Sequence, residues 1–87
     1  MLQRDAADWH NEGIGLHSSG DYEKAIRCFD HALEIDPGYA GAWYNKGYAL
    51  AELTRYAESI QCYDHALKVD PKSRNVFHEN GIRNLHW

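Results

Sequence analysis

The sequence predicts an all-α fold in which antiparallel helical hairpins stack into an α-solenoid. Three observations support this prediction: a repeat of 34 residues, apolar residues at helical spacing, and turn residues between the expected helices. A fixed period of this size indicates that each unit is one supersecondary element, which buries its apolar face against its neighbours. The 87 residues suffice for two complete units and the beginning of a third.

The repeat appears as identical residues 34 positions apart. In the first half of the unit, Trp9 recurs as Trp43 and Gly13 as Gly47. The repeat is denser in the second half, where the matched pairs are Ile26 and Ile60, Cys28 and Cys62, Asp30 and Asp64, His31 and His65, Ala32 and Ala66, Leu33 and Leu67, Asp36 and Asp70, and Pro37 and Pro71. Both halves of the unit are therefore conserved between its two copies in this chain.

The first hairpin is expected to contain helices over about residues 7–19 and 22–35, because apolar side chains recur there at three- and four-residue spacing. Gly20 can adopt the left-handed conformation that ends a helix, and Asp21 can cap the next one. A turn containing proline, at residues 36–38, ends the second helix because proline disfavours helical geometry in the residue before it.

The second hairpin repeats this pattern over about residues 40–53 and 56–69. A final helix is expected over about 74–87, with Ser73 as its cap. The second turn has Thr54 where the first has glycine. If this turn requires a positive φ angle, a β-branched residue is strained there.

Gly13 and Gly47 lie within expected helices, where glycine costs about 1 kcal/mol relative to alanine. A tertiary contact must therefore favour them, and we expect it to be close packing against the second helix of each hairpin. For Gly13 the expected neighbour on that helix is Ala32. The second repeat also has Ser59 at the position that corresponds to Ala25 in the first.

Composition argues against several classes of function. The formal net charge is −4, and the Lys and Arg residues are scattered, whereas a nucleic-acid binder needs them clustered. No apolar run reaches membrane-spanning length, and the amino terminus lacks the features of a signal peptide. We therefore expect a cytoplasmic protein with no nucleic-acid or membrane partner. The sequence also lacks a nucleophile signature and a phosphate-binding glycine loop, so we expect no enzyme activity and no cofactor.

A duplicated Cys-x-x-His motif suggests one metal hypothesis. Residues three apart share a helix face, and thiolate and imidazole groups are zinc ligands. The four candidate ligands are Cys28, His31, Cys62 and His65. Equivalent positions in stacked repeats are expected to lie too far apart to share one ion, or to form a disulfide, which needs Cα atoms within about 7 Å. We therefore expect two free thiols and no intrinsic metal site.

The repeat resembles that of the tetratricopeptide repeat family. The family pattern of Trp, Gly, aromatic, Ala, aromatic, Ala and Pro is compared in the first unit with Trp9, Gly13, Leu16, Ala25, Phe29, Ala32 and Pro37, and in the second with Trp43, Gly47, Leu50, Ser59, Tyr63, Ala66 and Pro71. Phe77 and Gly81 begin a third unit. The resemblance implies one right-handed superhelical domain over 1–87, with repeats at about 6–39 and 40–73 and a terminal helix at about 74–87.

The resemblance also implies a non-catalytic scaffold that binds a peptide or partner segment on its concave face, which the first helix of each unit lines. The residues expected to contact the partner are His10, Ile14, His17, Tyr44, Asn45, Tyr48, Glu52, His78 and Ile82. They form an apolar row beside a row of histidine and tyrosine, which suits an extended or helical peptide. The other interpretation of these aromatic side chains is that they only cover the superhelix.

Two alternatives to the receptor function stay open. The terminal helix ends with Ile82, Leu85 and Trp87, and this apolar edge would be buried if two copies formed a homodimer. A fragment cut from a longer repeat array would look the same. A receptor for chaperone carboxyl termini is not expected. Of the Lys, Asn and Arg clamp used by one subset of the family, only Asn45 is matched, and Glu79 would repel a carboxylate.

Overall fold

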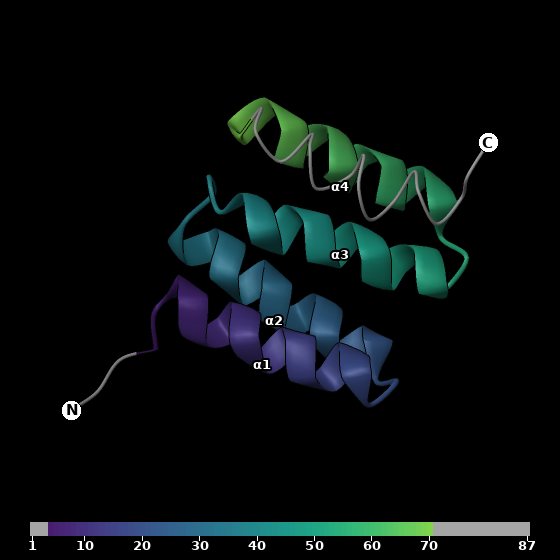
Figure 1. Cartoon of the computed structure of the whole chain (residues 1–87), viewed down its shortest axis with the longest axis horizontal. Coiled ribbons are helices and arrows are strands. Elements are labelled where there is room, and N and C mark those ends of the chain that lie inside the picture. The colour runs from purple at the N-terminus through teal and green to yellow at the C-terminus, as the bar shows by residue number, and fades with distance from the viewer. Residues whose placement is uncertain (1–3, 71–87) are drawn as a thin grey trace.

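The computed structural model describes residues 4–70, and these form four α-helices joined by short turns. The helices are α1 (Ala6–Ser18), α2 (Tyr22–Ile35), α3 (Ala40–Glu52) and α4 (Tyr56–Val69). Figure 1 shows α1 and α2 as one hairpin, with the hairpin of α3 and α4 stacked beside it. The all-α fold of helical hairpins is confirmed, and every expected boundary of these four helices agrees within one residue. The expected helix over 74–87 and its cap lie outside the described residues.

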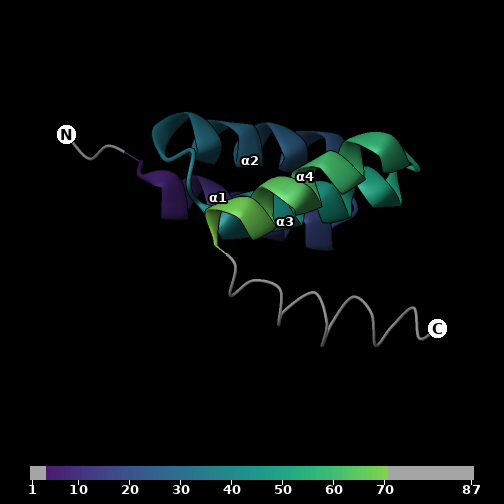
Figure 2. The ribbon, with the colours of Figure 1, turned by 90° about the horizontal axis from the view of Figure 1, so that it is seen from above.

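The helices occupy two layers, and contacts between α2 and α3 join the two hairpins. Figure 2 shows α1 and α3 on the same side of α2. The longest helices within residues 4–70 have 14 residues. None of the helices in that range combines the length and the apolar character that crossing a membrane requires.

Local sequence explains the ends of the helices in the first hairpin. Asp5 accepts a hydrogen bond from the backbone N–H of Asp8, and the Asp8 carboxylate accepts one from the backbone N–H of Asp5. Asp21 caps α2 as expected by accepting from a backbone N–H in the first turn. The turns between paired helices use left-handed residues, with φ of 86° at Gly20 and 62° at Thr54. Thr54 therefore adopts the positive φ angle at which a β-branched residue is expected to be strained.

Two glycines allow the helices of each hairpin to approach closely. A Cβ atom on Gly13 would lie 2.5 Å from the ring of Phe29, and one on Gly47 would lie 2.7 Å from the ring of Tyr63. Close packing is confirmed, but the expected neighbour of Gly13 was wrong. The ring of Phe29 on α2 lies opposite Gly13, and Ala32 is buried in the same cluster as Phe29.

The buried apolar side chains form two clusters. One lies around Phe29, where α1 and α2 meet the beginning of α3, and the other includes Ile26, Leu50 and Cys62 from α2, α3 and α4. Trp43 packs against both clusters, so a single side chain links the cores of the two repeats. Both cysteines are buried and their thiols are free, as expected.

Candidate binding surface

The first helices of the two repeats together carry most of the side chains expected to contact a partner. We name this surface the α1–α3 face and define it by His10, Ile14, His17, Tyr44, Asn45, Tyr48 and Glu52. Ile14 and Tyr48 stand one repeat apart, with exposed fractions of 40% and 43%. Two further expected contacts, His78 and Ile82, lie outside the described residues.

His10 connects the two repeats at one end of the α1–α3 face. Its Nε2 lies 2.7 Å from the Asn45 amide nitrogen, and its Nδ1 lies 3.4 Å from the Tyr39 hydroxyl. The first contact fits a neutral imidazole that accepts a hydrogen bond from the amide. Burial lowers the pKa of His10, although a backbone hydrogen bond with Gly41 opposes this effect. His10 and Asn45 therefore contact each other, and their contact with a partner stays a prediction.

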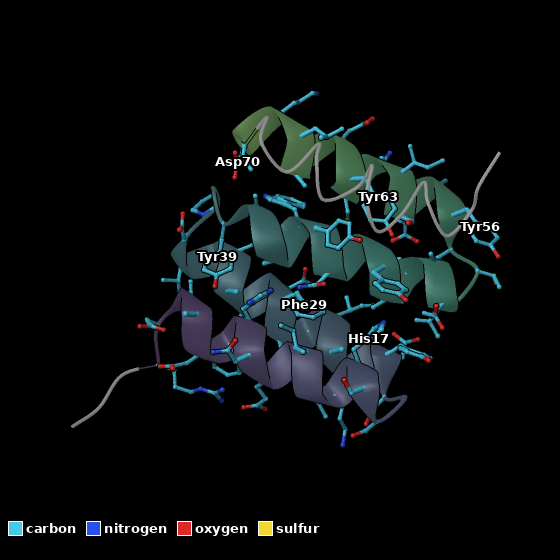
Figure 3. The ribbon with its side chains drawn as sticks, viewed as in Figure 1. His17, Phe29, Tyr39, Tyr56, Tyr63 and Asp70 are labelled. Carbon is cyan, nitrogen blue, oxygen red and sulfur yellow. The ribbon has the colours of Figure 1, made fainter. Side chains whose placement is uncertain are left out.

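At the other end of this face, side chains from three helices meet around His17. Its ring centroid lies 4.8 Å from that of Tyr48 on α3 and 5.1 Å from that of Tyr22 on α2. Figure 3 shows His17 on the side of α1 that faces α3. Desolvation raises the pKa of Tyr22, and the nearby Glu52 carboxylate raises it further.

The sequence prediction omitted Tyr22 from the site, although a signal was present. Tyr22 is the first residue of α2, directly after the cap Asp21. A short turn brings the beginning of α2 beside the end of α1, where His17 lies. A search for candidate residues at the tips of the hairpins, in addition to the faces of their first helices, would have found it.

Tyr44 lies within the α1–α3 face but packs toward α4. Its ring centroid is 5.5 Å from that of Tyr63, which Figure 3 shows between α3 and α4. Burial raises the pKa of both phenols, so they remain protonated and uncharged at neutral pH. Tyr44 therefore joins the two helices of its own hairpin, and its role in binding a partner stays a prediction.

The α1–α3 face is poor in positive charge. Lys46 is the one Lys or Arg within α1 and α3. Its ammonium group lies 2.6 Å from the Asp30 carboxylate on α2, so it is engaged between the layers. Arg4, which precedes α1, forms an ion pair with Glu12. The described part of the face therefore presents aromatic, apolar and amide groups together with the Glu52 carboxylate.

The duplicated Cys-x-x-His motif contributes to packing. His31 stacks on Trp9 and His65 stacks on Trp43, with ring centroids 4.4 Å apart in both pairs. Burial raises the pKa of both cysteine thiols, which favours the protonated form over the thiolate that binds metal. Across residues 4–70, no group of three or more His, Cys, Asp and Glu side chains is placed to hold a metal ion.

The paired antiparallel helices stack through α2 and α3, and their first helices expose Ile14 and Tyr48. This arrangement defines a helical-hairpin repeat protein. The chain belongs to the tetratricopeptide repeat family. Residues 15–54 match the family model described as TPR repeat, and residues 40–73 match the one described as Tetratricopeptide repeat. The resemblance found in the sequence is thereby confirmed. Repeats of this family generally mediate protein–protein interaction, and proteins that contain them are generally non-catalytic scaffolds.

A comparison with curated proteins gives one similar stretch. The chain is 47% identical over 32 residues to Protein STIP1 homolog from Dictyostelium discoideum. The matched stretch covers 37% of this chain and 6% of that protein. The chain therefore corresponds to a small part of the length of this relative, and the similarity is confined to about one repeat.

Proposed function

We propose that this chain binds a segment of a partner protein on the α1–α3 face, without catalysis and without a cofactor. The observation that carries the proposal is the exposure of Ile14 and Tyr48, two large apolar side chains at equivalent positions of adjacent repeats. Contiguous exposed apolar groups on a folded protein are typical of an interaction surface. A segment that crosses both repeats would bury one apolar side chain against each of them.

The described residues divide by role in this proposal. Ile14, His17, Tyr48 and Glu52 contact the partner directly, because they lie at the surface between the two first helices or at its rim. His10, Asn45 and Tyr44 mainly fix the relative position of α1, α3 and α4. His78 and Ile82 extend the same rows into the third unit on the basis of the 34-residue period. The whole chain, residues 1–87, is proposed to act as one domain.

A peptide library displayed on phage tests this proposal. Selected peptides are resynthesised, and their affinity for the natural chain and for two variants is measured by fluorescence anisotropy. Tyr48→Ala is expected to weaken binding about tenfold or more, because truncating an aromatic contact residue commonly costs over 1 kcal/mol. Ile35→Ala removes an exposed apolar side chain from α2 and serves as the matched control.

The two variants must first show the helical circular dichroism and melting behaviour of the natural chain. Retained affinity in Tyr48→Ala would remove the α1–α3 face from consideration. An equal loss in both variants would also contradict the proposal, because it would show no preference for this face over α2.

A second candidate function is association of the repeats end to end. Ile26 on α2 is 8% exposed because α3 covers it, whereas Ile60, its equivalent on α4, is 60% exposed. The helix expected over 74–87, another copy of the chain, or a further repeat of a longer array could each cover Ile60 as α3 covers Ile26. Light scattering over a wide range of protein concentration tests self-association. A constant monomer mass would rule it out, and a dimer that Ile60→Asp dissociates would establish it.

We also propose a cytoplasmic location. The two cysteines are buried and unpaired, which is usual for proteins of reducing compartments. Fluorescence microscopy of the tagged chain tests this proposal, and accumulation in an oxidising compartment would contradict it.

A further inference from the structure

We propose that the His17 end of the α1–α3 face binds a cationic side chain, lysine or arginine, of the partner segment. The groups that bind it are His17, Tyr22, Tyr48 and Glu52, which we name the cation cluster. This inference rests on the proposed function and adds the chemistry of the partner. Its support comes from the arrangement of the rings, from the position of the carboxylate, and from the distribution of positive charge over α1 and α3.

The rings of the cation cluster come from three helices and are inclined to one another. The plane of His17 makes an angle of 57° with that of Tyr48 and 63° with that of Tyr22. Rings at such angles form a corner and leave part of their faces uncovered, and Tyr48 is 43% exposed. The negative face of an aromatic ring attracts an ammonium or guanidinium group, and the aliphatic stem of lysine or arginine packs against the same ring.

Glu52 supplies the opposite charge at the rim of this corner. The residue is exposed and ends α3. It lies four residues after Tyr48, on the same face of α3. Its carboxylate is near enough to the Tyr22 hydroxyl to contribute to the raised pKa of Tyr22, and an ionised carboxylate offers several acceptor sites. A bound cation would therefore contact ring faces and a carboxylate at the same time.

A second feature of the cluster is a buried nitrogen atom without a hydrogen-bond partner. Nε2 of His17 is buried and has no hydrogen-bond partner within residues 4–70. Buried polar atoms are nearly always paired in folded proteins. A donor group of the partner that enters between His17 and Tyr48, with a small rotation of the exposed tyrosine ring, would give this nitrogen a partner.

The charges of the surrounding helices favour a cationic ligand over an anionic one. Lys46 is the single Lys or Arg of α1 and α3, and its ion pair with Asp30 holds it toward α2. Arg55, directly before α4, is the nearest other cation in sequence, and it is engaged in ion pairs with Glu23 and Glu58. An acidic partner would be repelled by Glu52, and such repulsion discriminates strongly between partners. The formal net charge of −4 also favours association with a basic segment.

Four short peptides test the proposal against the full chain labelled with ¹⁵N. Each is acetylated and amidated and contains two leucines, three serines and two copies of a variable residue, which is lysine, arginine, norleucine or glutamate. Binding is followed by chemical-shift changes of the backbone amides. We expect the lysine and arginine peptides to bind at least threefold more tightly than the norleucine peptide, with the largest shifts at Tyr48 and Glu52, and the glutamate peptide to bind more weakly than all others.

Two isosteric variants separate the site from the overall charge. Glu52→Gln is expected to lower the affinity of the lysine peptide to that of the norleucine peptide, because the amide keeps the shape of the side chain without its charge. Glu34→Gln makes the same change of net charge on α2, where Glu34 faces His31, and is expected to leave the affinity unchanged. An equal effect of both variants would overturn the proposal.

The remaining outcomes distinguish this inference from the proposed function. If the norleucine and lysine peptides bind equally, and Tyr48→Ala abolishes the binding of both, the face binds peptides but the cation cluster does not select a cationic side chain. If none of the four peptides binds, the proposal that the cation cluster binds lysine or arginine is also wrong. In that case, peptides selected from the phage library that depend on Tyr48 would still support the proposed function.

Discussion

The imidazole of His31 stacks on the indole of Trp9, with ring centroids 4.4 Å apart and an angle of 29° between the ring planes. The same contact recurs 34 residues later, where His65 stacks on Trp43 with an angle of 18°. Each stack joins the second helix of a hairpin to the first. A repeated packing contact therefore accounts for the histidine of the duplicated Cys-x-x-His motif.

Substitutions at His65 test this packing role. His65→Ala is expected to lower the free energy of unfolding by about 0.5–1.5 kcal/mol, because aromatic pairs contribute in this range. His65→Phe keeps a planar ring over Trp43 and is expected to retain most of this stability. Urea unfolding followed by circular dichroism measures both. A rise in melting temperature on adding zinc, seen in the natural chain and absent in His65→Phe, would instead indicate a metal-binding role.

Substituting glycine within the helices tests the close approach in the second hairpin. Gly47→Ala places a Cβ atom 2.7 Å from the Tyr63 ring and 3.1 Å from the Ser59 carbonyl oxygen. Gly15→Ala is the matched control, because its Cβ atom would have no neighbour within 4 Å. Both variants gain the same helix propensity, so their free energies of unfolding should differ by the cost of overpacking, about 1–3 kcal/mol. Equal stabilities would show that the Tyr63 ring moves aside without cost.

The turn between α3 and α4 offers a stabilising substitution. Thr54 has a φ of 62°, where a residue with a side chain costs about 1–2 kcal/mol. Thr54→Gly is therefore expected to raise the free energy of unfolding by up to about 1 kcal/mol, after the entropy cost of glycine. Gly20→Ala, at a φ of 86°, is the reciprocal variant and is expected to lower it. A loss of stability in Thr54→Gly would mean that the threonine side chain contributes more than its backbone strain costs.

Much of the fold was predictable because its signals are local. The cap at Asp21 and the left-handed turn at Gly20 are determined by residues within a few positions of each other, and the structure places α2 at the expected Tyr22–Ile35. The neighbour of Gly13 was not predictable in this way. It depends on the register of two antiparallel helices, which places the Phe29 ring opposite Gly13 and which no short motif specifies.

The binding surface was predictable only in part for the same reason. Repeat positions placed His10 and His17 on one face, but their contacts come from segments outside that pattern. Tyr39 reaches His10 from the turn between the repeats, and Tyr22 reaches His17 from the tip of the first hairpin. These contacts depend on the angle between helices and between repeats. Sequence spacing alone does not specify that angle.

The inter-repeat contact of His10 predicts a dependence of stability on pH. Burial lowers the pKa of His10 in the folded chain below the unperturbed value of 6.5. Around this pH the unfolded chain therefore binds more protons than the folded one. The stability from His10 is fully present above pH 6.5 and is lost as the pH falls from 6.5 toward the lower pKa of the folded state.

The variant His10→Gln isolates this effect from the other titrating groups. Its amide can hydrogen-bond with Asn45 and Tyr39 but does not titrate. The free energies of unfolding of the natural chain and the variant are measured at pH 7.5 and at pH 5.5. At each pH, the value for the variant is subtracted from the value for the natural chain. This difference is expected to be smaller at pH 5.5, because only the natural chain loses the contribution of neutral His10. A difference that is constant or grows on acidification would show that protonated His10 is accommodated beside Asn45, by rotation of the amide to present its oxygen.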